Sequence, residues 1–513
     1  MPGDLPTVAE VLRHQAQSRA EHALLVCDGE RIGYADAERR SAELARGLIA
    51  LGAGKGTHVG LLYPNGIEFV IGMLAAARIG AVVIPFSTFA TARELREQLV
   101  DSDTEILLAI RSFRSHDYAQ RLAEVIGCAG LDSDERLFVT AVPQLRRVVV
   151  DSSRVHTAAR TVPPALLEAM EDDVDGCDPL AIVYTSGSTS APKGVVHTHA
   201  CLLTHQRNLN EIRGLTAADR LFCNSPFFWI GGFAFGLLAT LVAGSTLVCS
   251  NATDPGATLD LLEAERPTIT NGFVAGIAHI ADHPSFPGRD LSSMRRGNLY
   301  PIMAPDARPA DPELRHNMLG LTEAGSVVLI SGDESDQPEH RRGSFGKPAP
   351  GFDTKIVDPD ASGIGELCIR GPYVMQGYYK RSREECFDAD GWFHTGDLVR
   401  VDADGFFYFA GRLGAMIKTA GANVSAAEVE KAIAKVTGAE AHVVGIPDPR
   451  RGEVVAAVVA RPGLDEAALR ERLKTELSAY KIPKRFIALP GDEIPRLSSG
   501  KVDTQRLRKL FDA

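Results

Sequence analysis

The chain lacks several features that mark familiar classes of protein. Its eight cysteines are scattered without a CxxC pair or a neighbouring histidine cluster, which argues against disulfide and zinc roles and indicates reduced thiols. The N-terminus contains no apolar signal core. A net charge of −11 argues against non-specific binding to nucleic acids or anionic membranes. We therefore expect a cytoplasmic protein without nucleic-acid partners.

Charge is absent altogether between Arg220 and Asp254, and part of this stretch is long enough to span a bilayer. However, glycines interrupt it, and Gly244 and Ser245 predict a turn between a buried helix and a strand at 246–249. We interpret the stretch as buried core and expect no transmembrane segment.

What the sequence does contain is an alternation of helix and strand signals. Helices are predicted at 36–51 and 67–79, and a capping box at Thr91 and Glu94 begins another. Strands are predicted between them, at 59–63, 81–85 and 105–110. This order is typical of an α/β fold with parallel sheets covered by helices. At 513 residues, two or more domains are expected.

The pattern changes toward the C-terminus. Asp404 and Gly405 predict a hairpin, and helices are expected at 426–435 and 466–479. We therefore predict a small, separate α+β domain with its boundary at the flexible 411–415 segment. The predicted domains are 1–411 and 412–513, with a hinge near 412–415.

A loop of small and hydroxyl-bearing residues, YTSGSTSAPKG at 184–194, follows the apolar run 180–183. Its glycines let backbone N–H groups approach phosphate oxygens, its hydroxyls add donors, and Lys193 supplies positive charge. A P-loop is excluded, because Pro192 stands at the position of the second glycine and Gly194 follows the lysine. A generic Ser/Gly surface loop is the alternative.

The loop resembles the phosphate-binding signature YTSGTTGxPKG of adenylate-forming enzymes, the superfamily of acyl-CoA synthetases, luciferases and peptide-synthetase adenylation domains. Ser190 takes the place of a glycine and adds a Cβ there. The resemblance implies a large N-terminal domain of helix-flanked parallel sheets with a β-barrel-like part, and a small mobile C-terminal domain. It also implies that the loop binds the phosphates of ATP through Thr185, Ser186, Gly187, Ser188, Thr189 and Lys193.

Further blocks resemble the same family in the same order. DGWFHTGD at 390–397 implies that Asp397 binds the ribose, and the following GR pair makes Arg412 a ribose or phosphate ligand. LGLTEAG at 319–325 implies that Gly320 and Leu321 flank AMP. Thr322 would then donate to the α-phosphate or the substrate carboxylate, and Glu323 would bind Mg²⁺. For Thr322 and Glu323, a helix N-cap followed by an acidic first turn is the alternative.

The C-terminal segment contributes two more matches. PRLSSGK ends in Lys501, which the resemblance makes the catalytic lysine that stabilises charge during adenylation. IKTAG at 417–421 resembles the thiol tunnel, so Lys418 and Gly421 would line the path of CoA; without the resemblance it would be a loop leading into a helix. For the acid, we predict a pocket wall at 226–232 that includes Phe228, Trp229 and Gly232; for Phe227 and Phe228, a place in the hydrophobic core is the alternative. Tryptophan at a position where the family often has histidine favours a hydrophobic acid.

We therefore predict an ATP-dependent acid:CoA ligase that forms an acyl adenylate and then a thioester, on a fatty or other hydrophobic acid. ATP, Mg²⁺, CoA and a small carboxylic acid are its expected ligands, and a homodimer is allowed. An aryl or amino-acid ligase, or transfer to a carrier protein, is the nearest alternative. A nucleotide-binding protein without catalysis is another, suggested by Ser190, Leu319, Gly414 and Ala415. Lys193, Glu323, Asp397 and Lys501 count against it.

Overall fold

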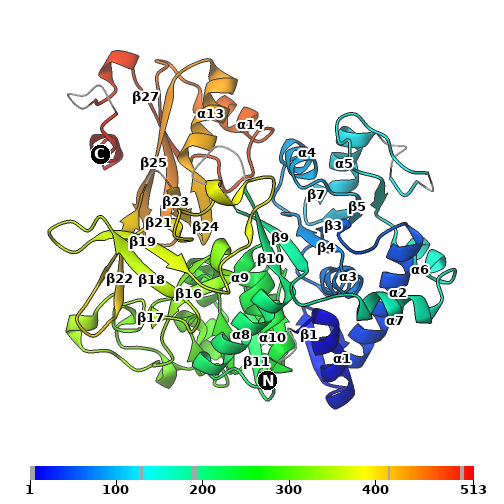
Figure 1. Ribbon diagram of the computed structural model, residues 1–513. Helices are drawn as coiled ribbons and strands as arrows, with labels where there is room; N and C mark the ends of the chain where they lie inside the picture. Colours follow the sequence, from blue (N-terminus) through cyan, green and yellow to red (C-terminus); the bar gives the residue numbers. More distant parts are fainter. Residues whose placement is uncertain are drawn as a thin grey trace. The chain divides into compact units, whose positions relative to one another are not determined.

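The computed structural model describes residues 6–127, 131–133, 135–185, 193–413, 416–496 and 502–512 (Figure 1). Contacts within the chain divide it into two compact units. Unit 1 comprises Met1–Thr88, Leu99–Tyr184 and Gly194–Gly411. Unit 2 comprises Phe89–Gln98, Thr185–Lys193 and Arg412–Ala513. The use of 412–415 as a hinge stays a prediction.

Two large sheets, mainly parallel, form most of unit 1 (Figure 1). One has the order β20 (Gly377–Tyr378), β10 (Lys193–Thr198), β9 (Pro179–Thr185), β4 (Val82–Pro85), β3 (His58–Leu62), β5 (Ile106–Ala109), β8 (Arg147–Val149). The other has the order β14 (Arg296–Gly297), β13 (Ile269–Asn271), β11 (Arg220–Cys223), β12 (Thr246–Cys249), β1 (Ala23–Cys27), β2 (Glu30–Gly33). The three strands predicted between 59 and 110 are present and pair in parallel, which confirms the α/β class.

The helices of unit 1 cover these sheets. They are α1 (Val8–Ser18), α2 (Tyr34–Ala50), α3 (Ile67–Arg78), α5 (Tyr118–Ile126), α6 (Ser152–Ala159), α7 (Pro164–Asp172), α8 (His199–Arg213), α11 (Pro255–Glu265) and α12 (Ala278–Ala281). Apart from Glu68, every residue of α3 is buried. A helix that is apolar on all sides belongs inside the core, and α3 packs there together with β1, β3 and β4. Helix α4 (Ala92–Asp101) begins with the predicted capping box of Thr91 and Glu94.

The uncharged stretch folds as buried core, as expected. It contains β11, the short helix α9 (Ile230–Gly232), a π-helical turn η2 (Phe233–Leu238), α10 (Ala239–Ala243) and β12. Gly244, at φ 69°, ends α10 in the left-handed conformation that glycine adopts without strain. Within the described ranges, no helix is both long and apolar enough to cross a membrane.

Two small antiparallel sheets form the barrel-like part of unit 1. One contains β15 (Leu319–Leu321), β16 (Ser326–Ile330) and β17 (Lys347–Pro348). The other contains β18 (Asp353–Val357), β19 (Gly365–Arg370), β21 (Phe393–Val401) and β22 (Phe407–Arg412). They share one hydrophobic core, and backbone bonds from Phe345 to Phe407 and from Phe407 to Gly346 join the chain segments.

Unit 2 contains a sheet of β24 (Ala422–Ser425), β23 (Met416–Thr419), β26 (Gly452–Val459) and β25 (Ala441–Asp448), with β27 (Arg485–Ala488) beside β26. Alternate residues of β26 face two cores: Val455 and Ala457 pack with α13 (Ala426–Thr437) and α14 (Glu466–Leu473), while Val454 and Ala456 pack with α15 (Thr504–Lys509). Helix α14 ends at Leu473, well before the predicted 479. The Thr475 hydroxyl donates to the Arg472 carbonyl oxygen there, a local bond that competes with helix continuation.

Candidate active site

The Thr322–Glu323 pair lies in a tight turn between two paired strands. β15 ends at Leu321, residues 322–324 form one 3₁₀ turn, and Gly325 at φ 66° leads into β16. Thr322 is therefore the first residue of a single 3₁₀ turn and not the N-cap of an α-helix. Gly320 faces β16 so closely that a Cβ would lie 2.8 Å from the Ser326 carbonyl oxygen. Only glycine fits there, which brings the two strands together beneath the turn.

Glu323 is almost fully buried, and its carboxylate is oriented from one side. The Tyr378 hydroxyl donates to Oε1 at 2.7 Å, and the Met375 N–H donates to the Glu323 carbonyl oxygen at 2.8 Å. Oε2 accepts no hydrogen bond from the described residues. A carboxylate with one oxygen fixed and the other available suits a ligand of a hard cation such as Mg²⁺.

Thr322 is fixed through its backbone, which leaves its hydroxyl available. The Nε2 atom of His197 donates to the Thr322 carbonyl oxygen at 2.7 Å. Burial lowers the pKa of His197 to about 4, so the ring is neutral at physiological pH and holds this single donor. The Thr322 hydroxyl has no partner among the described residues, so it can donate to a bound ligand.

Strand β10 links this turn to the predicted phosphate loop. It begins at Lys193, directly after the loop, and carries His197. Its antiparallel neighbour is β20, in which Tyr378 stands opposite Val195. The strand that follows the loop thus supports both Thr322 and, through β20, Glu323. His197 and Tyr378 were not predicted, because no local motif distinguishes them.

Asp397 is presented by a bulge between β19 and β21. Glu366 on β19 pairs with Leu398 on β21, and Cys368, two residues later, pairs with His394, four residues earlier. Strand β21 therefore has two extra residues at this point. The Thr395 hydroxyl closes the bulge by donating to the Leu367 carbonyl oxygen at 2.7 Å and accepting from the Asp397 N–H at 3.0 Å. Bulges often direct a side chain at active sites, and here the bulge fixes the backbone of a buried aspartate.

The predicted wall of the acid pocket is an aromatic corner. The rings of Phe228 and Trp229 meet edge-to-face at 5.6 Å, and Trp229 meets Phe273 in the same way at 5.9 Å. Phe273, from the segment after β13, was not predicted. Phe227 is instead a core residue, because it is fully buried and packs on Phe69 at 5.4 Å.

Gly232 and η2 shape the backbone behind this aromatic corner. A Cβ at Gly232 would lie 2.7 Å from the Ser225 carbonyl oxygen and closer still to that of Pro226. The helix then widens into the π-turn η2, a feature frequently found at functional sites.

The other predicted residues belong to unit 2 or lie outside the described residues. Thr185 ends β9, Lys193 begins β10 and Arg412 ends β22. Lys418 is exposed on β23, and Gly421, at φ 86°, lies in the turn between β23 and β24. The loop that we expected from the 417–421 sequence alone is therefore a β-hairpin. Outside the described residues lie Ser186, Gly187, Ser188, Thr189, Ser190, Gly414, Ala415 and Lys501.

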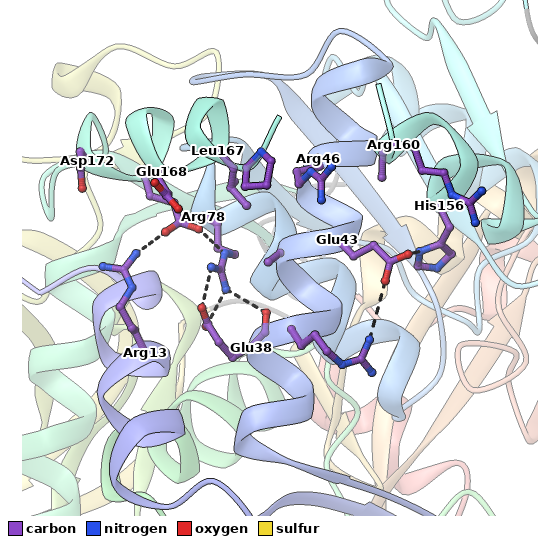
Figure 2. A pocket seen from close by; sticks show the side chains of 15 residues that line it. Arg13, Glu38, Glu43, Arg46, Arg78, His156, Arg160, Leu167, Glu168 and Asp172 are labelled. Atoms are coloured by element: carbon purple, nitrogen blue, oxygen red, sulfur yellow. Dashed lines mark hydrogen bonds and ion pairs between the residues drawn. The ribbon is translucent and has the colours of Figure 1, made fainter. Parts of the chain in front are cut away.

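A cavity of about 760 Å³ lies elsewhere, between α1, α2, α6 and α7 (Figure 2). At its base the Arg78 guanidinium bonds to Glu38 at 2.7 Å and to Glu171 at 2.5 Å, and Arg13 also pairs with Glu171. Five arginines and five acidic residues line the cavity, so their formal charges cancel. None of the predicted site residues is among them. We interpret this network as a structural ion-pair cluster that joins the helices.

Comparisons with known proteins match most of the chain. The family model described as AMP-binding enzyme matches residues 12–379, and the AMP-binding enzyme C-terminal domain matches residues 428–501. A feruloyl-CoA synthase of an Amycolatopsis species is 33% identical over 501 residues, covering 94% of each chain. A Mycobacterium tuberculosis 3-[(3aS,4S,7aS)-7a-methyl-1,5-dioxo-octahydro-1H-inden-4-yl]propanoyl:CoA ligase is also 33% identical, covering 99% of this chain and all of its own.

Solved structures share the fold. A Mycobacterium tuberculosis fatty acyl CoA synthetase matches with a TM-score of 0.66 and 26% identity over 98% of both chains. The amide bond synthetase McbA from Marinactinospora thermotolerans matches with a TM-score of 0.77 and 24% identity, over 99% of this chain and 100% of that one. The chain therefore belongs to the AMP-binding enzymes and is an acyl-CoA synthetase of the adenylate-forming superfamily.

Proposed function

We propose that this ATP-dependent acid:CoA ligase activates a fatty or other hydrophobic carboxylic acid. The observation that carries the proposal is the aromatic corner of Phe228, Trp229 and Phe273. Phe228 and Trp229 lie within a stretch of chain, 221–253, that has no charged residue and is largely buried. A pocket wall of this composition stabilises an apolar acyl group by removing its surface from water. It provides no carboxylate to pair with the amine of an amino acid.

The chemistry divides into two half-reactions. A carboxylate oxygen of the acid attacks the α-phosphate of ATP and pyrophosphate leaves; the thiol of CoA then attacks the acyl carbon and displaces AMP. In our proposal the Thr322 hydroxyl donates to the α-phosphate or the carboxylate, and Asp397 accepts from the ribose hydroxyls. Such prepositioned groups lower the barrier because they are already oriented toward the developing charge.

Mg²⁺ fits the same proposal. Glu323 would hold it through Oε2, while Tyr378 keeps the carboxylate in position. Bound Mg²⁺ would offset negative charge on the phosphates.

Unit 2 supplies the remaining proposed ligands. Residues 185–189 and Lys193 bind the departing phosphates, Arg412 binds ribose or phosphate, and Lys501 stabilises charge at the reacting centre. Lys418 and Gly421 border the path of the CoA thiol. The use of ATP and CoA supports a cytoplasmic location, and a homodimer stays a prediction.

An aryl acid is the second candidate. Edge-to-face aromatic rings can bind a planar ring as well as an alkyl chain, and one relative at 33% identity is named a feruloyl-CoA synthase. Transfer to a carrier protein in place of CoA is the remaining alternative, and thioester formation with free CoA tests it.

The acid class can be tested by measuring acid-dependent pyrophosphate release and thioester formation with CoA. The panel comprises fatty, aryl, polycyclic, short polar and amino acids. We expect kcat/KM to be highest for hydrophobic acids. Trp229→Ala should change kcat/KM more than Trp229→Phe does, because it removes more side-chain volume. Pyrophosphate release that favours acetate or an amino acid, or that ignores both substitutions, would contradict the assigned pocket.

Lys501 can be tested by separating the half-reactions. Lys501→Ala should lower the rate of adenylate formation by about 100-fold or more, the typical effect of removing one charge-stabilising group. It should leave thioester formation from supplied acyl adenylate near the parent rate. Equal losses in both half-reactions would show that Lys501 does not act specifically in adenylation.

A further inference from the structure

A second cluster of ligand-type side chains lies on the antiparallel sheet of β18, β19, β21 and β22. Glu366 and Cys368 are two residues apart on β19 and so point to the same face. His394 on β21 is the direct cross-strand partner of Cys368. Its Nδ1 atom lies 3.4 Å from Cys368 Sγ and 2.8 Å from Glu366 Oε2. One ligand atom from each of the three residues lies within 4.8 Å of the others.

We propose that Glu366, Cys368 and His394 bind a divalent metal ion of the zinc class, through Oε2, Sγ and Nδ1. Thiolate, imidazole and carboxylate are the ligands that zinc uses, and three protein ligands leave the fourth tetrahedral position for water. Tetrahedral zinc holds sulfur and nitrogen ligands about 3.5 Å apart, given its bond lengths of about 2.3 Å and 2.0 Å. The observed 3.4 Å is close to this separation. His394 Nδ1 and Glu366 Oε2, at 2.8 Å, must move apart by a few tenths of an ångström to bind the same ion.

Neighbouring groups orient two of the three ligands. The Gly396 N–H donates to Glu366 Oε1 at 2.9 Å, which leaves Oε2 for the metal. Asp388 Oδ2 lies 3.6 Å from His394 Nε2, the nitrogen opposite the metal-binding one. A carboxylate at that position favours the tautomer with its proton on Nε2, as in most metal-binding histidines. The structure therefore contains supporting groups as well as ligands.

The local charges are compatible with a dication. With the Cys368 proton released to solvent as the sulfur–metal bond forms, Cys368 and Glu366 carry two negative charges. The cation that faces the cluster, Lys355, lies 3.3 Å from Asp388 Oδ2 and is paired with it. This site differs from the one proposed at Glu323 in having a soft sulfur ligand, which selects zinc-class ions over Mg²⁺.

The test uses the full chain, stripped with EDTA and free of ATP and Mg²⁺. Titration with Co²⁺ should produce the near-ultraviolet charge-transfer band of a thiolate–cobalt bond and saturate at one ion per chain. Zn²⁺ should then displace Co²⁺ and bleach the band. Absence of the band would overturn the proposal and leave the three residues as a hydrogen-bonded cluster only.

Three substitutions assign the band to this site. Cys368→Ser should abolish it, whereas Cys177→Ser, which alters an exposed free cysteine, should leave it unchanged. Asp388→Asn should weaken Co²⁺ binding by about 10- to 100-fold, the usual effect of losing the carboxylate behind a metal-bound histidine. A band that survives Cys368→Ser, or that disappears in Cys177→Ser, would overturn the proposal.

Folding is controlled by measuring Tm of each variant in EDTA. If Cys368→Ser does not fold, His394→Gln replaces it, because the exposed His394 side chain tolerates substitution. Loss of the cobalt band in a His394→Gln variant with unchanged Tm supports the site. Unchanged cobalt affinity in that variant overturns it.

Discussion

At the scale of single residues, two side chains hold the residues that we propose to contact the substrates. Tyr378 is one of them, since its hydroxyl orients the buried Glu323 carboxylate. His197 is another, because it supports Thr322 through the backbone. Neither residue touches the substrates in our proposal. Their replacement should therefore act through the position of Thr322 and Glu323.

Tyr378→Phe tests this support. Removing one hydrogen bond to a charged group costs about 1.5–3 kcal/mol, so adenylation should slow by about 10- to 100-fold. The Mg²⁺ concentration for half-maximal rate should rise, because the carboxylate is no longer held in position. Pyrophosphate release measured across Mg²⁺ concentrations would show both effects.

The adjacent Tyr379 provides a matched control. Its hydroxyl donates to Asp103 at 2.9 Å, away from Glu323. Tyr379→Phe loses the same atom from the neighbouring residue and should leave the Mg²⁺ dependence unchanged. If both variants change it equally, Tyr378 has no specific role in orienting Glu323.

At the scale of elements, the proposed site residues lie where regular structure is interrupted. Asp397 lies in a strand bulge, Thr322 in a 3₁₀ turn, and Trp229 directly before α9 and its π-helical extension. Such interruptions require particular residues. The two adjacent glycines of α9, Gly231 and Gly232, differ in this respect, because only Gly232 lies too close to other atoms to carry a Cβ.

Gly232→Ala should destabilise the protein, whereas Gly231→Ala should not. A Cβ at 232 meets the carbonyl oxygens of Ser225 and Pro226, but at 231 the nearest atom, Ser225 Oγ, is 3.7 Å away. Overpacking of this kind costs about 1–3 kcal/mol. Urea unfolding of the two variants measures the difference. Equal stabilities would show that the backbone at 232 relaxes freely.

At the scale of the whole molecule, burial makes stability depend on pH. Three histidines on β10 and α8, namely His197, His199 and His205, are buried, and desolvation lowers the pKa of each to about 4. Unfolding exposes them to water, where their pKa returns to about 6.5. Between these values the unfolded chain binds more protons, so the free energy of unfolding falls as pH falls from about 6.5 to 4.

Each histidine contributes up to about 3 kcal/mol to this loss, from about 1.4 kcal/mol per pKa unit. His205→Gln, which keeps an amide donor, should remove about a third of the part of the pH slope that these three histidines contribute. Urea unfolding at several pH values measures the slope. His279→Gln, at an exposed position, is the control and should leave it unchanged. An unaltered slope in His205→Gln would contradict the assignment.

The sequence by itself determined the α/β class, the main strands and helices, and the family. These follow from local information: hydrophobic periodicity, a capping box at Thr91 and Glu94, and motifs read in order. It did not determine α14's true end at Leu473 or the hairpin at 416–425. The Thr475–Arg472 bond competes with the helix locally, and β23 pairs both with its neighbour β24 and with the distant strand β26.

Only the tertiary structure decided which side chains meet. Tyr378 reaches Glu323 across 55 residues of sequence, and Thr322 meets His197 across 125. Scattered cysteines argued against zinc, yet the register of β19 and β21 sets Cys368 beside His394, 26 residues away. Spacing along the chain does not reveal such pairs, because strand register brings them together only when the sheet forms.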